Sequence, residues 1–438
     1  MAVASIRRAT VLGLGRFGGG VAAARYLAHT GTAVTISDQA SADELADSIA
    51  QLADVAIARW QLGGHCDRDV RDADLVVVNP AIPPSHPQLQ LAQRLGVPVT
   101  TEIELFLQAC PARVAGVTGT HGKSTTSAML AAILEAAGMR VWLGGNIGGS
   151  LLGRLEEIAA DDWCILELSS FQLWHFTAEG RMPHIAVVTN FTANHLDWHG
   201  HLDDYRRAKQ RLIAQQQPGD FAVLNTHDAE VASWRPLACG HLVPLPPLEG
   251  VPPLTVPGEV NRINAACAAA AAQAAGCSAT AIECGLAGFR GLPQRLEWFA
   301  VVDGRRFYND STATTPESAI AAIEALDVPV WLLGGGRSKG FDFRPLAEAI
   351  ARRAAGAAFF GTARDELQQA ALRERPTLAC TSTEHLADAL AWCFERSKPG
   401  EAIVLSPGCA STDQYRNFRE RGERFVELVR ALAGKIRP

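Results

Sequence analysis

A lysine and a serine stand directly behind a glycine-bracketed turn, in the segment Val117-Thr118-Gly119-Thr120-His121-Gly122-Lys123-Ser124-Thr125-Thr126. The two glycines allow successive backbone N–H groups to converge on phosphate oxygens, and a helix that begins near Ser124 points the positive end of its dipole there. The lysine would reach the outer phosphates, and the serine hydroxyl would hold Mg²⁺. The segment therefore predicts a site for ATP or GTP, formed by Gly119, Thr120, Gly122, Lys123, Ser124 and Thr125.

The sequence on either side of this turn supplies the strand and the helix that a phosphate site requires. Residues 113–117 are mostly apolar and predict a strand, and residues 127–134 predict an amphipathic helix. The usual phosphate-loop pattern has a glycine where this chain has Val117, so the predicted loop is shorter than usual. A glycine turn that only caps a helix is the alternative, and the adjacent lysine and serine argue against it.

A second glycine-rich turn, Gly13-Leu14-Gly15-Arg16-Phe17-Gly18, lies between a predicted strand at 9–12 and an alanine-rich helix at 21–29. The next predicted strand, 33–37, ends at Asp38, whose carboxylate is placed to meet a sugar hydroxyl. This Rossmann-type pattern predicts a nucleotide site at the carboxyl ends of the strands. The motif alone does not establish NAD as the ligand.

Polar residues follow two further predicted strands. Glu167 lies near the end of the strand at 163–168, where its hard carboxylate oxygens suit Mg²⁺. The strand at 185–190 leads into a polar segment that contains three histidines, His195, His199 and His201. These histidines allow a zinc site, but without a cysteine beside them they are more typical of a polar loop.

Composition limits the class of protein. The chain has 438 residues, which predicts roughly two to four domains. Its 40 Lys and Arg against 46 Asp and Glu give a net charge of −6, which argues against nucleic acid or an anionic membrane as the main partner. No apolar run reaches about 18 residues and no signal peptide is evident, so we expect a cytoplasmic enzyme. The 10 cysteines form no Cys-x-x-Cys pair and are expected to be reduced.

Strands and helices alternate along the chain, as in parallel α/β sheets. We predict an α/β protein of three domains: a Rossmann-like N-terminal domain at 1–110, a central P-loop-type ATP-binding domain at 111–297 and a C-terminal Rossmann-like domain at 298–438. Strands of the last domain are expected at 328–333, 357–361 and 402–408. The alanine-dense run at 265–275 predicts a tightly packed helix.

A series of motifs in this chain resembles the Mur ligase family, and the resemblance covers essentially the whole sequence. The last two motifs resemble the signatures of the glutamate-adding member. In order, the motifs occupy residues 119–124, 145–148, 167–173, 194–200, 205–209, 261–265, 289–297, 309–315 and 405–418.

The resemblance implies an ATP-dependent amide ligase that serves peptidoglycan precursor synthesis. The family activates a substrate carboxylate as an acyl phosphate, and an amino acid then attacks to give the amide, ADP and phosphate. The implied substrates are UDP-N-acetylmuramoyl-L-alanine and D-glutamate, with L-glutamate or another amino acid as the alternative. ATP and Mg²⁺ at two sites are the implied cofactors, and a cytoplasmic monomer without a nucleic-acid or membrane partner is expected.

The resemblance also assigns the catalytic residues, Lys123, Glu167, His195 and Lys209. One Mg²⁺ is expected near Ser124 and Glu167, and the second near His195 and a carbamylated Lys209. Carbamylation requires a neutral amine, so burial must lower the lysine pKa from about 10.4. The residues around Lys209 by themselves predict a solvated helix position instead.

The remaining contacts are also implied by the resemblance. Contacts to ATP are expected from Asn261, Asn264, Arg295 and Asp310. Contacts to the UDP substrate are expected from Gly15, Arg16, Phe17, Asp38, Asn79, Asn146, Ser169 and Gln172. Contacts to glutamate are expected from Thr314, Lys339, Ser411 and Phe418.

Three positions depart from the family pattern. Thr312 stands where the family has a lysine that helps to bind a glutamate carboxylate, so a charge-assisted contact is lost. We expect Lys339 or Arg337 to compensate, or the amino-acid specificity to differ. Gln294 and Val260 stand where histidine is common, and we expect them to affect nucleotide packing more than chemistry.

Two other functions fit part of the sequence. An NAD-dependent oxidoreductase would use the turn at 13–18 but would leave Lys123, Glu167 and Lys209 without a role. A catalytically silent nucleotide-binding regulator would need no such set of residues, and the intact set argues against it.

Overall fold

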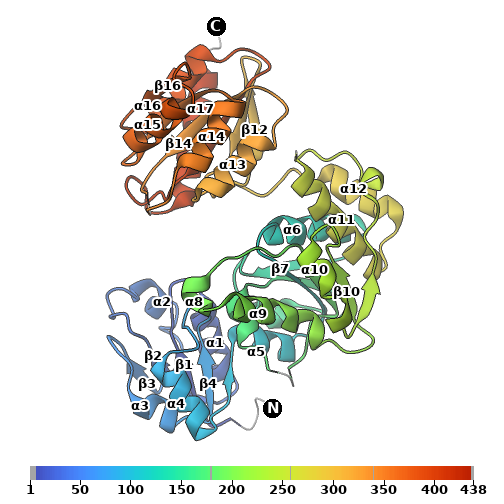
Figure 1. Ribbon diagram of the computed structural model, residues 1–438. Helices are drawn as coiled ribbons and strands as arrows, with labels where there is room; N and C mark the ends of the chain where they lie inside the picture. Colours follow the sequence, from blue (N-terminus) through green and yellow to red (C-terminus); the bar gives the residue numbers. More distant parts are fainter. Residues whose placement is uncertain (1–5, 178–179, 257, 339, 436–438) are drawn as a thin grey trace. The chain divides into compact units, whose positions relative to one another are not determined.

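The computed structural model describes residues 6–177, 180–256, 258–338 and 340–435 (Figure 1). Internal contacts divide the chain into two compact units, residues 1–252 with 263–287 and residues 253–262 with 288–438. The first unit holds two β-sheets and the second holds one. Helices accompany the strands of all three sheets, which confirms the predicted α/β class.

The first sheet is five-stranded, and each of its paired strands is parallel. Its elements are β1 (Arg8–Leu12), α1 (Gly19–His29), β2 (Ala33–Ser37), α2 (Ala46–Ala50), β3 (Arg59–Gln61), α3 (Asp67–Arg71), β4 (Leu75–Val78), α4 (Pro87–Leu95), β5 (Val99–Thr100) and α5 (Glu102–Ala109). The strand order is β3-β2-β1-β4-β5, so the chain reverses its direction across the sheet at β1. Such a switch point is where open α/β sheets bind ligands, and the glycine turn at 13–18 follows β1 there.

The second sheet is six-stranded, and its described pairs are also parallel. The elements that accompany it begin with β6 (Arg113–Thr118), α6 (Lys123–Ala136), β7 (Val141–Gly145), η2 (Leu152–Glu157), β8 (Trp163–Glu167), α7 (Ser170–Trp174), β9 (Ile185–Val188), α8 (Leu196–His199) and α9 (Leu202–Ala214). They continue with β10 (Phe221–Leu224), α10 (Ala229–Ser233), η3 (Arg235–Leu237), β11 (His241–Val243), η4 (Leu248–Gly250), α11 (Glu259–Ala274) and α12 (Ala279–Gly288). The order β11-β10-β9-β6-β8-β7 places β6 between β9 and β8, so the phosphate loop leaves from the middle of the sheet.

The third sheet lies in the second unit and has the order β12-β13-β17-β14-β15-β16. Its elements are β12 (Glu297–Val302), β13 (Arg305–Asn309), α13 (Pro316–Glu324), β14 (Val330–Gly335), α14 (Arg344–Arg353), β15 (Ala354–Phe360), α15 (Arg364–Glu374), β16 (Ala379–Ser382), α16 (Leu386–Arg396), β17 (Ala402–Gly408) and α17 (Phe418–Lys435). The β12–β13 pair is antiparallel, unlike the others. Asp303 and Gly304 connect these two strands at φ 51° and 72°, as a tight hairpin turn requires.

Apolar packing joins the two sheets of the first unit and covers both faces of the third sheet. In the first unit, one core contains side chains from both sheets, and α1 packs against α5 and η2. In the second unit, α16 and α17 cover one face of the sheet, and α13, α14 and α15 cover the other. This burial of both faces explains why β14 and β17 are buried along their whole length instead of alternating.

Most of the predicted elements are found, with small differences at their ends. The strands predicted at 33–37 and 402–408 have these bounds, and the helix predicted from the alanine-dense run at 265–275 is the later part of α11. The hairpin of β12 and β13 was not predicted. None of the described helices combines the length and the apolar character that a membrane span needs.

Candidate active site

The phosphate loop connects β6 to α6 through two glycines that no other residue could replace without strain. Gly119 has φ 148° and Gly122 has φ 76°. A Cβ at Gly119 would lie 1.9 Å from Thr189 Oγ1, and one at Gly122 would lie 2.3 Å from Asn264 Oδ1. The loop backbone is therefore closely packed, and Asn264 of α11 lies beside it.

Side chains from the neighbouring segment hold this loop in place. Thr120 Oγ1 accepts a hydrogen bond from Thr192 N at 3.0 Å and lies 3.0 Å from the Tyr205 hydroxyl. His121 N donates to Asn190 Oδ1 at 2.8 Å, and Asn190 Nδ2 donates back to His121 O at 3.0 Å. The loop is thus preorganised, which lowers the cost of aligning its donors on a phosphate.

Pairing of β6 with β8 brings the serine and the carboxylate predicted for Mg²⁺ together. Ser124 Oγ donates to Glu167 Oε2 at 2.5 Å, and Asn146 Nδ2 donates to Glu167 Oε1 at 2.8 Å. Glu167 is only 2% exposed and Ser124 only 5%. Two hard oxygen donors at the base of a phosphate loop are a suitable ligand set for Mg²⁺.

Lys209 lies on the buried face of α9 and is 1% exposed, so the solvated position that the local sequence predicts is wrong. Its Nζ donates to Gly119 O at 2.7 Å and lies 4.7 Å from the centroid of the Tyr205 ring. Burial lowers the pKa of Lys209 well below its usual range; the charge of Lys123 lowers it further and that of Glu167 opposes the shift. The amine is therefore neutral far more readily than a surface lysine.

The sequence carried a signal for this burial. Tyr205, Ala208, Leu212 and Ile213 are buried along α9, and Lys209 falls on the same face at helical spacing. A lysine on the apolar face of a helix is expected to be buried, and a buried lysine indicates a functional role.

Of the three histidines of the polar segment, His195 and His201 are exposed and His199 is buried. His195 is exposed, adopts φ 54° before α8, and its ring centroid lies 4.8 Å from Phe171 and 6.3 Å from Tyr205. His199 is 6% exposed and its Nε2 lies 2.9 Å from Ser170 Oγ. The Tyr205 ring is thus approached by His195, by His199 at 5.2 Å between ring centroids and by Lys209. In the part of the chain that the structure describes, no group of three or more His, Cys, Asp or Glu could hold a metal ion.

The glycine turn of the first sheet is shaped by two of the residues predicted to bind the UDP substrate. Asp38 accepts hydrogen bonds from Gly15 N at 3.1 Å and from Ala40 N at 2.8 Å. Asn79 Nδ2 donates to Gly13 O at 3.3 Å, and a Cβ on Gly15 would lie 2.6 Å from that amide nitrogen. The Asp38 carboxylate therefore has a structural role in this turn whether or not it meets a sugar.

Two other residues of this turn face solvent. The Phe17 side chain is 99% exposed. Arg16 forms an exposed ion pair with Glu44 at 3.2 Å. An aromatic ring and a cation at the carboxyl end of β1 are available to a nucleotide base and a diphosphate.

Ser169 and Gln172 form a capping box at the start of α7. Ser169 N donates to Gln172 Oε1 at 2.8 Å, and Gln172 N donates to Ser169 Oγ at 3.2 Å. This reciprocal pairing satisfies backbone donors at the helix start. It also holds the segment directly after Glu167 in a fixed conformation.

In the second unit, Asp310 is a buried carboxyl at the end of β13. It accepts from Leu296 N at 3.0 Å and from Ser406 Oγ at 2.7 Å, and burial raises its pKa to about 7. Thr312, the departure from the family pattern, donates its hydroxyl to Gln294 O at 3.0 Å. Arg295 is exposed and Asn261 is half-buried in the same unit.

The residues predicted to bind glutamate follow strands of the third sheet. Ser411 is 4% exposed in the loop after β17, Phe418 is 36% exposed at the start of α17, and Thr314 is half-buried. Ser311 Oγ donates to Phe418 O at 2.8 Å, which ties the loop after β13 to α17. Lys339 lies outside the described residues.

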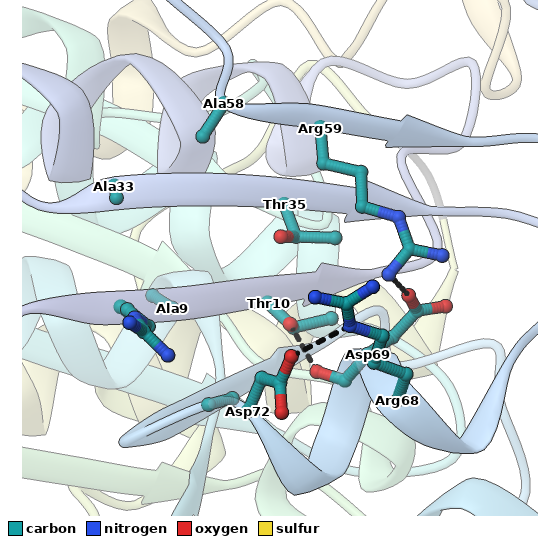
Figure 2. A pocket seen from close by; sticks show the side chains of 11 residues that line it. Ala9, Thr10, Ala33, Thr35, Ala58, Arg59, Arg68, Asp69 and Asp72 are labelled. Carbon is teal, nitrogen blue, oxygen red and sulfur yellow. Dashed lines mark hydrogen bonds and ion pairs between the residues drawn. The ribbon is translucent and has the colours of Figure 1, made fainter.

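A polar crevice on the first sheet lies away from all of these residues (Figure 2). It is lined by residues near the starts of β1, β2 and β3, at the opposite ends of the strands from the glycine turn. Arg59 pairs with Asp69 at 3.1 Å and Arg68 pairs with Asp72 at 2.8 Å (Figure 2). Because the predicted UDP-binding residues of the glycine turn follow the carboxyl end of β1, the crevice is not the predicted UDP site.

Comparison with known protein families finds three matching segments between residues 7 and 409. Three family descriptions match: Mur ligase MurD-like, N-terminal domain, at residues 7–101; Mur ligase middle domain at 117–242; and Mur ligase, glutamate ligase domain, at 294–409.

Individual proteins extend the match. The UDP-N-acetylmuramoylalanine–D-glutamate ligase of Symbiobacterium thermophilum is 35% identical over 453 residues, covering 97% of this chain and 98% of the relative. That of Pelotomaculum thermopropionicum is 34% identical over 451 residues, with the same coverage. The crystal structure of UDP-N-acetylmuramate-alanine ligase MurC from Thermotoga maritima shares the fold, with a TM-score of 0.59 and 18% identity over 97% of this chain and 99% of that one. The resemblance found in the sequence motifs is thus confirmed, and the chain belongs to the Mur ligase family.

Proposed function

We propose that this protein uses ATP to join D-glutamate to UDP-N-acetylmuramoyl-L-alanine, in the cytoplasmic synthesis of a peptidoglycan precursor. The observation that carries the proposal is the similarity of 34–35% over 97% of the chain to relatives named as D-glutamate ligases. The phosphate loop and the residues around it support the ATP-dependent part of the reaction.

The proposed reaction has two steps. A carboxylate oxygen of UDP-N-acetylmuramoyl-L-alanine attacks the γ-phosphorus of ATP, which forms an acyl phosphate and releases ADP. The amine of D-glutamate then attacks the acyl carbon, phosphate leaves with the bonding electrons, and the amine loses a proton. The products are the amide, ADP and phosphate.

The phosphate loop serves the first step by binding the triphosphate and offsetting its negative charge, which would otherwise repel the substrate carboxylate. Backbone N–H groups between Gly119 and Ser124 and the start of α6, at Lys123, would face the phosphates. Lys123 Nζ, which donates to Thr120 O at 2.9 Å, can turn to the outer phosphates. The loop is already fixed by Asn190 and Thr192, so little reorganisation is needed.

Mg²⁺ would be held at two places. Ser124 and Glu167, which are joined by a hydrogen bond of 2.5 Å, supply hard oxygens that suit the first ion. His195 and a carbamylated Lys209 would hold the second; the buried amine of Lys209 is suited to carbamylation because its pKa is lowered. When bound, Mg²⁺ neutralises the charge that develops on the phosphates.

The residues that contact each substrate follow the family motifs in this proposal. The UDP substrate is assigned to the turn at 13–18, with Asp38, Asn79, Asn146, Ser169 and Gln172. ATP is also assigned to Asn261, Asn264, Arg295 and Asp310, and glutamate to Thr314, Lys339, Ser411 and Phe418. We further propose that the enzyme acts as a monomer.

The first test is ADP release by the purified protein with UDP-N-acetylmuramoyl-L-alanine and Mg-ATP, in the presence of D-glutamate, L-glutamate or no amino acid. Release that depends on D-glutamate supports the proposal. Release that depends on L-glutamate alone would show that the enzyme is specific for L-glutamate, and it would link this specificity to Thr312. Absence of release with both amino acids overturns the proposed activity.

A further inference from the structure

Arg421 is a completely buried cation in the second unit. It lies in the first turn of α17 and has 0% of its surface exposed. A guanidinium is costly to remove from water and is kept in a protein interior only where partners compensate. Burial lowers the pKa of Arg421 to about 10, so the side chain still carries its charge at neutral pH.

The guanidinium donates to the loops that follow three different strands. Its Nε donates to Ser311 Oγ at 3.0 Å and its Nη2 to Ser311 O at 2.9 Å, in the loop after β13. Its Nη1 donates to Cys409 O at 3.1 Å, directly after β17, and to Gly335 O at 3.4 Å, at the end of β14. All four acceptors are neutral oxygens, so the hydrogen bonds leave the positive charge without a directly bonded carboxylate.

The three loops are packed around this group. Their strands β13, β17 and β14 are neighbours, so their carboxyl ends meet at one edge of the sheet. Arg337 and Ala410 exchange backbone hydrogen bonds of 2.8 and 3.1 Å across two of the loops. A Cβ on Gly336 would lie 2.2 Å from Ala410 O and 3.1 Å from Arg421 Nη1, so the backbone can approach only because this residue is glycine.

We propose that Arg421 is a positioning residue that holds these three loops in the arrangement that binds glutamate; the inference rests on the function proposed above. Ser411 lies two residues after Cys409, and Phe418 O accepts from the Ser311 hydroxyl that Arg421 also contacts. The planar fork of arginine reaches several acceptors at once, which the single ammonium of lysine does not. The carboxyl groups of Asp310 and Asp413 interact with this positive charge electrostatically, so the role proposed for Arg421 rests on its hydrogen bonds to the three loops.

The test compares Arg421→Ala and Arg421→Lys with the wild type in the full-length protein. We expect the KM for D-glutamate to rise about tenfold to a hundredfold in both variants, because bonds from a charged donor are lost. The KM values for ATP and for UDP-N-acetylmuramoyl-L-alanine should stay within about twofold, and kcat at saturating D-glutamate should change little. Added methylguanidinium should partly restore the KM for D-glutamate of Arg421→Ala.

Arg305 provides the matched control. It is also a buried arginine of the third sheet and is 9% exposed. It is the first residue of β13, at the opposite end of the strand from the loop that Arg421 contacts, and it donates to Ser397 O and Ser397 Oγ. Arg305→Ala should lower the melting temperature without a selective change in the KM for D-glutamate. A folded Arg421→Lys with the wild-type KM for D-glutamate overturns the inference, as does an equal rise in all three KM values.

Ser311→Ala keeps the inference testable if both Arg421 variants fail to fold. This change removes the hydroxyl that accepts from Arg421 and donates to Phe418 O, and it should raise the KM for D-glutamate by about tenfold, roughly as the loss of two hydrogen bonds predicts. An unchanged KM would reject the positioning role. If the wild type ligates D-glutamate and the variants keep the wild-type KM, this inference alone is rejected. If the wild type shows no glutamate-dependent ADP release, the proposed function is rejected and this inference with it.

Discussion

Two buried cations, one in each unit, show how the same burial cost leads to different roles. Lys209 in the first unit is 1% exposed and donates to one carbonyl, Gly119 O. Arg421 in the second unit is 0% exposed and donates to acceptors on three loops. Both lie near the carboxyl ends of parallel strands, where α/β sheets form their ligand sites.

The difference lies in what burial does to each side chain. Burial moves the pKa of Lys209 well below its usual range, so the lysine can give up its proton and become a neutral amine. The pKa of Arg421 falls only to about 10, so the arginine stays charged and must be surrounded by acceptors. A buried lysine is therefore available for chemistry, whereas a buried arginine organises the backbone around it.

The largest effect is expected from Lys209→Arg, which replaces a buried lysine that can become neutral with an arginine that stays charged. A guanidinium does not become neutral and cannot form the proposed carbamate. We expect kcat to fall by at least about a thousandfold, while ADP binding measured by calorimetry is retained.

The control for this experiment is Lys209→Ala. Short carboxylic acids such as acetate should restore part of its rate by taking the place of the carbamate, and they should not restore Arg421→Ala. A Lys209→Arg enzyme with a rate near that of the wild type would contradict the chemical role of the lysine.

Lys123→Ala tests whether the lysine of the phosphate loop acts through its positive charge, unlike the neutral amine proposed for Lys209 and the positioning role proposed for Arg421. Loss of its charge opposite the phosphates should lower kcat by about a hundredfold to a thousandfold. Because the charge of Lys123 lowers the pKa of Lys209, the variant should also need a higher pH to reach its own maximal rate. Steady-state rates between pH 6 and 9 measure both effects, with the exposed Lys398→Ala as control. A variant that keeps the wild-type kcat would remove the phosphate-loop assignment.

Sequence patterns predicted the fold and the phosphate loop because both are encoded locally. A strand, a turn with Gly119 and Gly122 and a helix follow one another within the segment, and their chemistry can be read without knowing their neighbours. The contact between Ser124 and Glu167 could not be read in this way because it depends on the pairing of β6 with β8. Which residues contact the substrates remains a prediction.

Both buried cations were missed by local reasoning for one physical reason. Charged side chains are expected in water, so a lysine or arginine within a charged helix is assigned to the surface. Arg421, Phe425 and Val429 nevertheless recur every four residues, and all three are 0% exposed. The apolar stripe was in the sequence, and the buried cation at its end was not recognisable without the loops that supply its acceptors.

Glu102, a half-buried carboxyl of the first unit, tests whether partial removal from water is enough to keep an acid neutral. Glu102 begins α5 and accepts a hydrogen bond from Ser150 in the loop that also carries Asn146, and burial raises its pKa from 4.5 to about 7. Between these pH values the folded state binds the proton and the unfolded state does not. The folded state is therefore favoured at low pH, and this contribution is lost as the pH rises through 7.

Glu102→Gln removes this titration while keeping a neutral group that can accept from Ser150. The variant and the wild type should have similar free energies of unfolding near pH 4.5. Above pH 7 the variant should be more stable by about 3 kcal/mol at most, since the shift is about 2.5 pH units. Urea unfolding across this range measures the difference, and the exposed Glu157→Gln is the control. A constant difference at all pH values would show that the carboxyl does not titrate there.

The smallest effect is expected where a cation pays no burial cost. Arg16 and Glu44 form an ion pair at 3.2 Å, but their side chains are 61% and 55% exposed. Solvent screening leaves such a pair at most about 0.5 kcal/mol of stability, so Arg16→Gln should unfold in urea almost as the wild type does. If Arg16 contacts the UDP substrate, the KM for that substrate should nevertheless rise, since a diphosphate would lose a charged donor. A variant with unchanged stability and unchanged KM would mean that Arg16 contributes neither to stability nor to substrate binding. A variant in which only the KM is raised would identify a third kind of cation, one that is solvated in the free enzyme and contacts the substrate when it binds.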